Sequence, residues 1–233
     1  MRYSGHVKLS LDRMIYAVCG GMILYVLLEF SGQFLLARMS HVPWGYRFDL
    51  WYYVNNLFFV AAMLSVAVAY RFKAEVFHWD GERTPATTSW IKSIALGLLG
   101  GAVALVVASP TFWFGWGNRQ LESTQLLIAD AFSPLAVLNL LFVIFAIAVG
   151  SEIVFRGIFL RTLAGYASMP AAVLASCLFF AYIFPVLGSV AGIILGITCS
   201  ILYYKTKNLL APIFANALFT VGGSGIALYH RLM

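Results

Sequence analysis

Long apolar runs separated by short polar stretches dominate the pattern of residues along this chain. A helix needs about 20 residues to cross the ~30 Å of hydrocarbon in a bilayer. Seven runs have roughly this length, and they are residues 14–36, 51–70, 91–109, 135–159, 169–186, 189–204 and 209–229. The pattern therefore predicts an all-α fold, a polytopic transmembrane helical bundle with about seven spans.

The fifth and sixth runs are short, and only residues 184–188 separate them. They form either a tight helical hairpin or one broken element. No internal repeat, linker or low-complexity segment interrupts the chain, so we expect residues 1–233 to form a single membrane domain. Composition agrees, because 62% of the residues are hydrophobic and only 10% are charged. Soluble domains carry roughly a quarter charged residues.

The basic residues predict how the bundle is oriented. Cytoplasmic loops of membrane proteins carry an excess of Lys and Arg. With the N-terminus in the cytoplasm, the inner side holds eleven basic residues: Arg2, Lys8, Arg13, Arg71, Lys73, Arg83, Lys92, Arg156, Arg161, Lys205 and Lys207. The outer side holds four: Arg38, Arg47, Arg119 and Arg231. We therefore predict a cytoplasmic N-terminus. The net charge of +6 reflects this orientation, so we expect no nucleic-acid partner.

Two glycine pairs predict close helix crossings. Gly97 and Gly101 are four residues apart, as are Gly192 and Gly196. Small residues at this spacing let two helix backbones approach closely in a membrane. Packing within the chain is the favoured interpretation, and dimerisation is the alternative.

One charged pair stands out at the end of the fourth run. Glu152 and Arg156 are four residues apart, so their side chains lie on one helix face and can reach each other. The pair is either a catalytic carboxylate held by a guanidinium or a structural ion pair that ties helices together. Without a neighbouring base, the residues themselves favour the structural interpretation.

Other candidate residues point to no metal and no cofactor. All four histidines fall outside the apolar runs, which leaves no buried imidazole to bind zinc or haem. Cys19, Cys177 and Cys199 lack metal-ligand spacing and are expected to be small core residues. Glu29 is either a proton-relay group or a solvated carboxylate. Three asparagines are expected to hydrogen-bond between helices rather than to bind ligands: Asn55, Asn56 and Asn139.

The segment that begins Ser151-Glu-Ile-Val-Phe-Arg-Gly157 resembles the first motif of the CAAX protease and bacteriocin-processing (CPBP, Abi-type) family, Glu-Glu-x-x-x-Arg. Its members are intramembrane glutamic-type proteases with a helical bundle fold. Residues 179–184 stand where the family has Phe-x-x-x-His. Residues 208–220 are similar to its Ser-Leu-x-x-Pro-Ile-x-x-His-x-x-x-Asn motif. The resemblance covers about residues 143–221.

The chain departs from this family at its catalytic positions, which here hold Ser151, Phe184, Asn216 and Thr220. The resemblance implies that the first Glu and the motif-two His activate water, and that the last His and Asn support the oxyanion. Neither Ser151 nor Phe184 can act as a general base. Asn216 can still donate a hydrogen bond, while Glu152 and Arg156 of the motif remain.

These departures predict a catalytically inactive homologue of the CPBP proteases. We expect a scaffold, chaperone or accessory subunit that binds another integral membrane protein or a lipid-modified peptide. One alternative is an active intramembrane endopeptidase that uses Glu152. Another is a small transporter that uses Glu29 and the pair Asn55 and Asn56. We expect an integral multi-pass protein of a bacterial-type plasma (inner) membrane, with membrane lipid as a further partner.

Overall fold

The computed structural model describes residues 11–39, 61–62, 90–113, 148–183 and 189–232. Within these residues every element is a helix and there is no strand, which confirms the all-α prediction. Several predicted features lie outside the described residues. They are most of the second run, residues 135–147 of the fourth run, and Phe184. The side chains of Glu29 and of the three asparagines at 55, 56 and 139 are also outside the described part.

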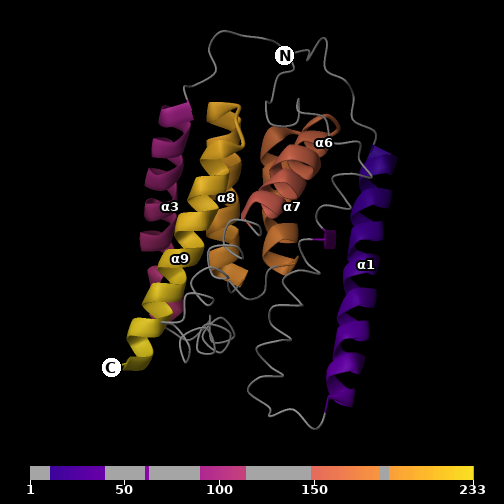
Figure 1. Cartoon of the computed structure of the whole chain (residues 1–233). Coiled ribbons are helices and arrows are strands. Elements are labelled where there is room, and N and C mark those ends of the chain that lie inside the picture. The colour runs from indigo at the N-terminus through magenta and orange to yellow at the C-terminus, as the bar shows by residue number, and fades with distance from the viewer. Residues whose placement is uncertain (1–10, 40–60, 63–89, 114–147, 184–188, 233) are drawn as a thin grey trace.

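The described helices follow the predicted runs closely (Figure 1). They are α1 (Leu11–Arg38), α3 (Trp90–Trp113), η2 (Ile153–Leu160), α6 (Arg161–Ala164), α7 (Met169–Ile183), α8 (Ser189–Thr206) and α9 (Leu210–Leu232). The fifth and sixth runs form two separate helices, α7 and α8, so the hairpin interpretation is confirmed for this part of the chain. The element η2 is a π-helix, which the sequence pattern did not predict.

Glycine contacts fix the directions of the packed helices. A Cβ added to Gly97 would collide with the carbonyl oxygen of Ala211, and one added to Gly101 would lie 2.7 Å from that of Ala215. Four residues further along α3, the contact lies four residues further along α9, so α3 and α9 run parallel. On α8, Gly192 lies against Ala181 and Gly196 against Cys177 of α7, an antiparallel order. Both glycine pairs therefore pack helices of the same chain, as the favoured interpretation predicted.

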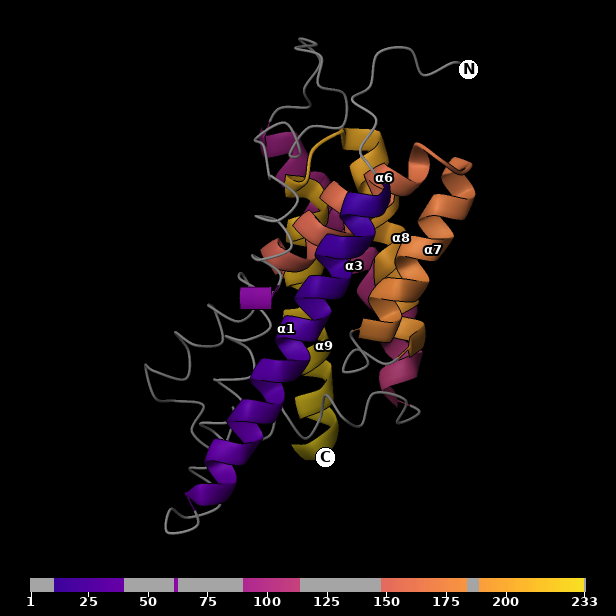
Figure 2. The same ribbon diagram turned by 90° about the vertical axis from the view of Figure 1, so that its right-hand side faces the viewer.

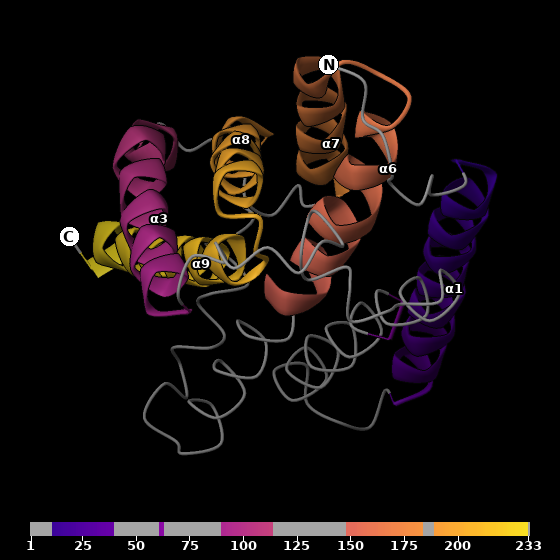
Figure 3. The same cartoon turned by 90° about the horizontal axis from the view of Figure 1, so that it is seen from above.

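An aromatic cluster fills the centre between η2 and α7. The rings of Phe155 and Phe180 meet edge to face, with centroids 5.2 Å apart. Phe179 stacks on Phe159 at 5.0 Å. Further apolar side chains complete this core, and they come from α1, α3, α8 and α9, among them Met14, Ala104, Leu195 and Phe219. Only the first turns of α1 contribute to it, and α1 lies at the margin of the described bundle (Figures 2 and 3).

Two of the described helices are long and apolar enough to cross a membrane. The qualifying segments are Met14–Gly32 in α1 and Trp90–Thr111 in α3. Only 24% and 28% of their respective residues are buried, so both present broad apolar surfaces. The apolar segments of α7, α8 and α9 are shorter: Met169–Tyr182, Val190–Thr206 and Leu210–Gly223. The described helices are therefore consistent with a membrane protein.

The change Gly101→Ala is expected to destabilise the protein by about 1–3 kcal/mol, because the new methyl group would overlap the backbone of α9. The matched control is Gly20→Ala in α1, where a Cβ would meet nothing within 4 Å. Alanine favours a helix more than glycine, so this control should be neutral or slightly stabilising. Thermal unfolding in detergent measures both. Equal melting temperatures for the two variants would contradict the packing described for α3 and α9.

Candidate functional site

Glu152 and Arg156 form a buried ion pair at the start of η2. Arg156 Nη1 donates to Glu152 Oε1 over 3.1 Å, and both side chains have 0% exposure. The prediction that they share one face and reach each other is confirmed. A charge can be held away from water when it is paired and hydrogen-bonded. The surroundings of this pair therefore decide what the site can do.

The pair lies where the chain changes from α-helix to π-helix. Residues 151–152 are α-helical, and η2 follows from Ile153 to Leu160 with seven of its eight residues buried. π-Helices are rare and occur frequently at functional sites. The carbonyl of Phe155 within η2 accepts a hydrogen bond from Ser176 Oγ of α7 at 3.1 Å. A neighbouring helix thus bonds directly to the backbone of this unusual segment.

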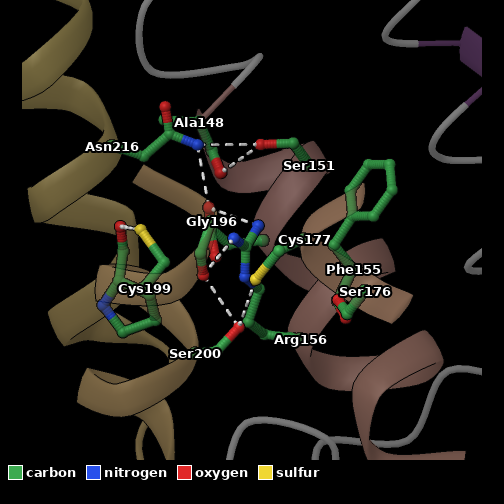
Figure 4. Close-up of polar contacts among 12 residues, drawn as sticks. Ala148, Ser151, Phe155, Arg156, Ser176, Cys177, Gly196, Cys199, Ser200 and Asn216 are labelled. Atoms are coloured by element: carbon green, nitrogen blue, oxygen red, sulfur yellow. Dashed lines mark hydrogen bonds and ion pairs between the residues drawn. The ribbon is translucent and has the colours of Figure 1, made fainter. Parts of the chain in front are cut away.

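Arg156 reaches across to α8 and α7 (Figure 4). Its Nη2 donates to the carbonyl oxygen of Gly196 at 3.0 Å, and its guanidinium lies 4.6 Å from the centre of the Phe180 ring. The same Gly196 carbonyl accepts a hydrogen bond from Ser200 Oγ at 2.8 Å. Gly196 faces Cys177 of α7 and has no side chain, so α7 and α8 can pack closely beside the guanidinium.

Asn216 of α9 joins the pair from the opposite side. Its Nδ2 donates to Glu152 Oε1 at 2.8 Å and to Ser151 Oγ at 3.1 Å. Its Oδ1 accepts a hydrogen bond from Thr220 at 3.3 Å. Three of the four family catalytic positions, Ser151, Asn216 and Thr220, therefore lie in one hydrogen-bonded chain beside Glu152. The fourth, Phe184, lies outside the described residues.

The polar groups at the motif positions are already engaged in hydrogen bonds. Ser151 Oγ donates to the carbonyl of Ala148 at 3.2 Å, so its proton is directed away from Glu152. Both amide hydrogens of Asn216 are engaged by Ser151 and Glu152, so neither is available to an oxyanion. The polar groups of the motif bond to one another and to the backbone.

Two atoms of the ion pair are exceptions. Glu152 Oε2 and Arg156 Nε are buried and have no hydrogen-bond partner among the described residues. The part of the chain that the structure describes also contains no group of three His, Cys, Asp or Glu side chains able to hold a metal ion.

Two of the three cysteines are core residues, as expected. Cys199 Sγ donates to the carbonyl of Pro212 at 3.6 Å, and Cys177 Sγ lies 3.8 Å from Ser200 Oγ. The expectation for Cys19 was wrong, because this residue is exposed. It lies on the face of α1 that points away from the core residues Met14, Ala17 and Val18.

Sequence reasoning missed two residues that support the site. Ser176 and Ser200 are buried hydroxyls that bond to the backbone of η2 and α8. The available signal was a polar residue inside an otherwise apolar run. That signal is weak, because a serine can equally bond to its own helix, as Ser31 does to Leu27.

The helical bundle and its buried Glu152, Arg156 and Asn216 agree with the resemblance to the intramembrane CAAX proteases. Residues 133–222 match the family model of the type II CAAX prenyl endopeptidase Rce1-like proteins. This match confirms the resemblance found over residues 143–221. No curated protein and no solved structure matches the chain.

Proposed function

We propose that this protein is a multi-pass membrane protein of the Rce1-like family that does not hydrolyse peptides and works by binding another integral membrane protein. One observation carries the proposal. Ser151, Glu152 and Asn216 occupy motif positions of the family. Asn216 donates hydrogen bonds to Ser151 and Glu152, and Ser151 donates one to a backbone carbonyl of its own helix. Such a site holds helices together.

The chemistry of peptide hydrolysis supports the loss of activity. Activation of water needs a general base, and neither Ser151 nor Phe184 supplies one. Loss of one oxyanion donor lowers the rate about 10²–10³-fold. The amide of Asn216, which could have served as such a donor, already bonds to Glu152 and Ser151.

The directions of the described helices support a multi-pass bundle with a cytoplasmic N-terminus. The parallel pair α3 and α9 and the antiparallel pair α7 and α8 fit a chain that crosses seven times. Lys92, Arg161, Lys205 and Lys207 lie at helix ends that face the same side (Figure 1). Arg156 lies inside the bundle instead, so it no longer counts among the orienting charges. The bias becomes ten against four.

Hydrolysis of CAAX-type or leader peptides by the purified protein is expected to be undetectable. The measurement compares wild type with Glu152→Gln, after both are shown to be folded in detergent or vesicles. Both should match the background without protein. Turnover that is present in wild type and disappears in Glu152→Gln would instead establish an active protease.

One observation favours that active-protease alternative. Glu152 Oε2 has no hydrogen-bond partner among the described residues, so this buried oxygen is the atom that a water or a substrate group would have to reach. Glu152 would then be the base, although its other oxygen is already bonded to Arg156 and Asn216. The peptide assay separates the two functions.

A stable complex within the membrane is the second expected result. A bundle that keeps its fold but lacks catalytic groups can still act by binding another membrane protein. Gentle solubilisation of the native bacterial-type plasma membrane, followed by native mass measurement, should give a species heavier than 25.7 kDa plus detergent and lipid. Identification of the extra mass as a single integral membrane protein would support the role. A lone chain in every mild detergent would contradict it.

A further inference from the structure

One end of the described bundle gathers basic side chains. Lys92 lies in the first turn of α3, Arg161 begins α6, and Lys205 and Lys207 lie at the end of α8. We call these four residues the basic end. The end of η2 and the end of α8 come together there, because Leu160, next to Arg161, packs in one cluster with Tyr203 and Leu209, which flank Lys205 and Lys207 in the sequence. Helix α3 joins them, since Gly100 lies against Leu202 of α8.

Lys207 adopts a backbone conformation that is energetically unfavourable for a lysine. Its φ is 55°, and its amide donates to the carbonyl of Tyr203 at 2.9 Å. This is the left-handed position that ends many helices, and glycine is the usual residue there because a Cβ is unfavourable. A lysine at this position is therefore uncommon.

The side chain of Lys207 is held in place at the surface. Its ammonium group lies 4.3 Å from the centre of the Tyr204 ring, and Tyr204 is 42% exposed. Lys205, two residues earlier, is exposed. At the start of α3, Trp90 and Ile91 are 72% and 78% exposed, beside Lys92. Exposed aromatic residues beside basic ones are typical of the boundary between hydrocarbon and lipid headgroups.

We propose that the basic end binds the phosphate groups of anionic phospholipids, with Lys205 and Lys207 as its main contacts. Each basic residue close to an anionic membrane surface contributes a favourable interaction that salt weakens. The aromatic and aliphatic side chains at the same level would contact the upper part of the acyl chains. The proposal does not depend on whether the protein hydrolyses peptides or binds another protein.

The test is retention of lipid by the full-length protein in nanodiscs that contain equal amounts of phosphatidylglycerol and phosphatidylcholine. Wild type should retain phosphatidylglycerol preferentially when released for native mass spectrometry. Lys205→Gln and Lys207→Gly should each reduce that preference about five-fold, as expected for the loss of one basic residue at the surface. Raised salt should reduce the preference of wild type.

Lys207→Gly separates lipid binding from folding. Glycine relieves the left-handed conformation, so this variant should melt at the same temperature as wild type or higher. The matched control is Arg38→Gln, at the far end of α1, where Arg38 lies 4.9 Å from the ring of Phe34. This control should leave the preference unchanged. Equal retention of both lipids by wild type, an equal effect of the control, or full displacement by millimolar inorganic phosphate would overturn the proposal.

Discussion

Arg156→Ala is expected to cost about 3–5 kcal/mol of the free energy of unfolding, because it leaves Glu152 buried without its counter-ion. The same change removes the hydrogen bond to Gly196 and the contact with the Phe180 ring. Unfolding in detergent, followed by circular dichroism against a denaturant, measures the cost.

The double variant Glu152→Gln with Arg156→Met is the control for this prediction. It removes both charges and keeps much of the side-chain volume, so it should be milder than Arg156→Ala alone. Arg156→Lys should fall between them, because it keeps the charge and loses the forked geometry that reaches Glu152 and Gly196 together. If all three variants unfold like wild type, the pair does not hold the helices together.

Asn216→Leu is expected to cost about 1.5–3 kcal/mol, since it removes the hydrogen bonds to the charged Glu152 and to Ser151, together with the acceptor of the Thr220 hydroxyl. Leucine branches at the same carbon as asparagine, so the substitution keeps the shape of the side chain and removes its polar atoms. Unfolding by the same method gives the value.

Thr220→Val is the matched control on the same helix. It removes a longer hydrogen bond of 3.3 Å between two neutral groups and should cost less than about 1 kcal/mol. A Thr220→Val loss as large as that of Asn216→Leu would show that the packing of α9, and not the amide of Asn216, stabilises the site.

The part of the fold that depends on local pattern was predictable. Apolar runs of the right length identified α1, α3, α7, α8 and α9 to within a few residues. The glycine spacings on α3 and α8 identified two helix contacts, because only small residues allow backbones to approach so closely. The number of spans remains a prediction, since much of the second and fourth runs lies outside the described residues.

The site was only partly predictable. The four-residue spacing was sufficient to bring Glu152 and Arg156 together, because that contact is local to one helix. The family motifs indicated that Asn216 could donate a hydrogen bond, but its contact with Glu152, 64 residues earlier in the chain, was not predicted. The π-helix could not be predicted, because its backbone conformation is supported by partners on other helices, such as Ser176. Those partners are visible only when the chain has folded.

The separation of these contacts along the chain has a consequence for how the protein enters its membrane. The Glu152–Arg156 bond joins residues four apart, so it forms as soon as this helix winds during synthesis. The partners Gly196 and Asn216 lie 40 residues after Arg156 and 64 residues after Glu152. In the multi-pass topology that we propose, this helix would enter the membrane with its two charges already paired, before α8 and α9 have been made, at a lower cost than a single charge would impose. The later helices then dock on a charge pair that is already formed.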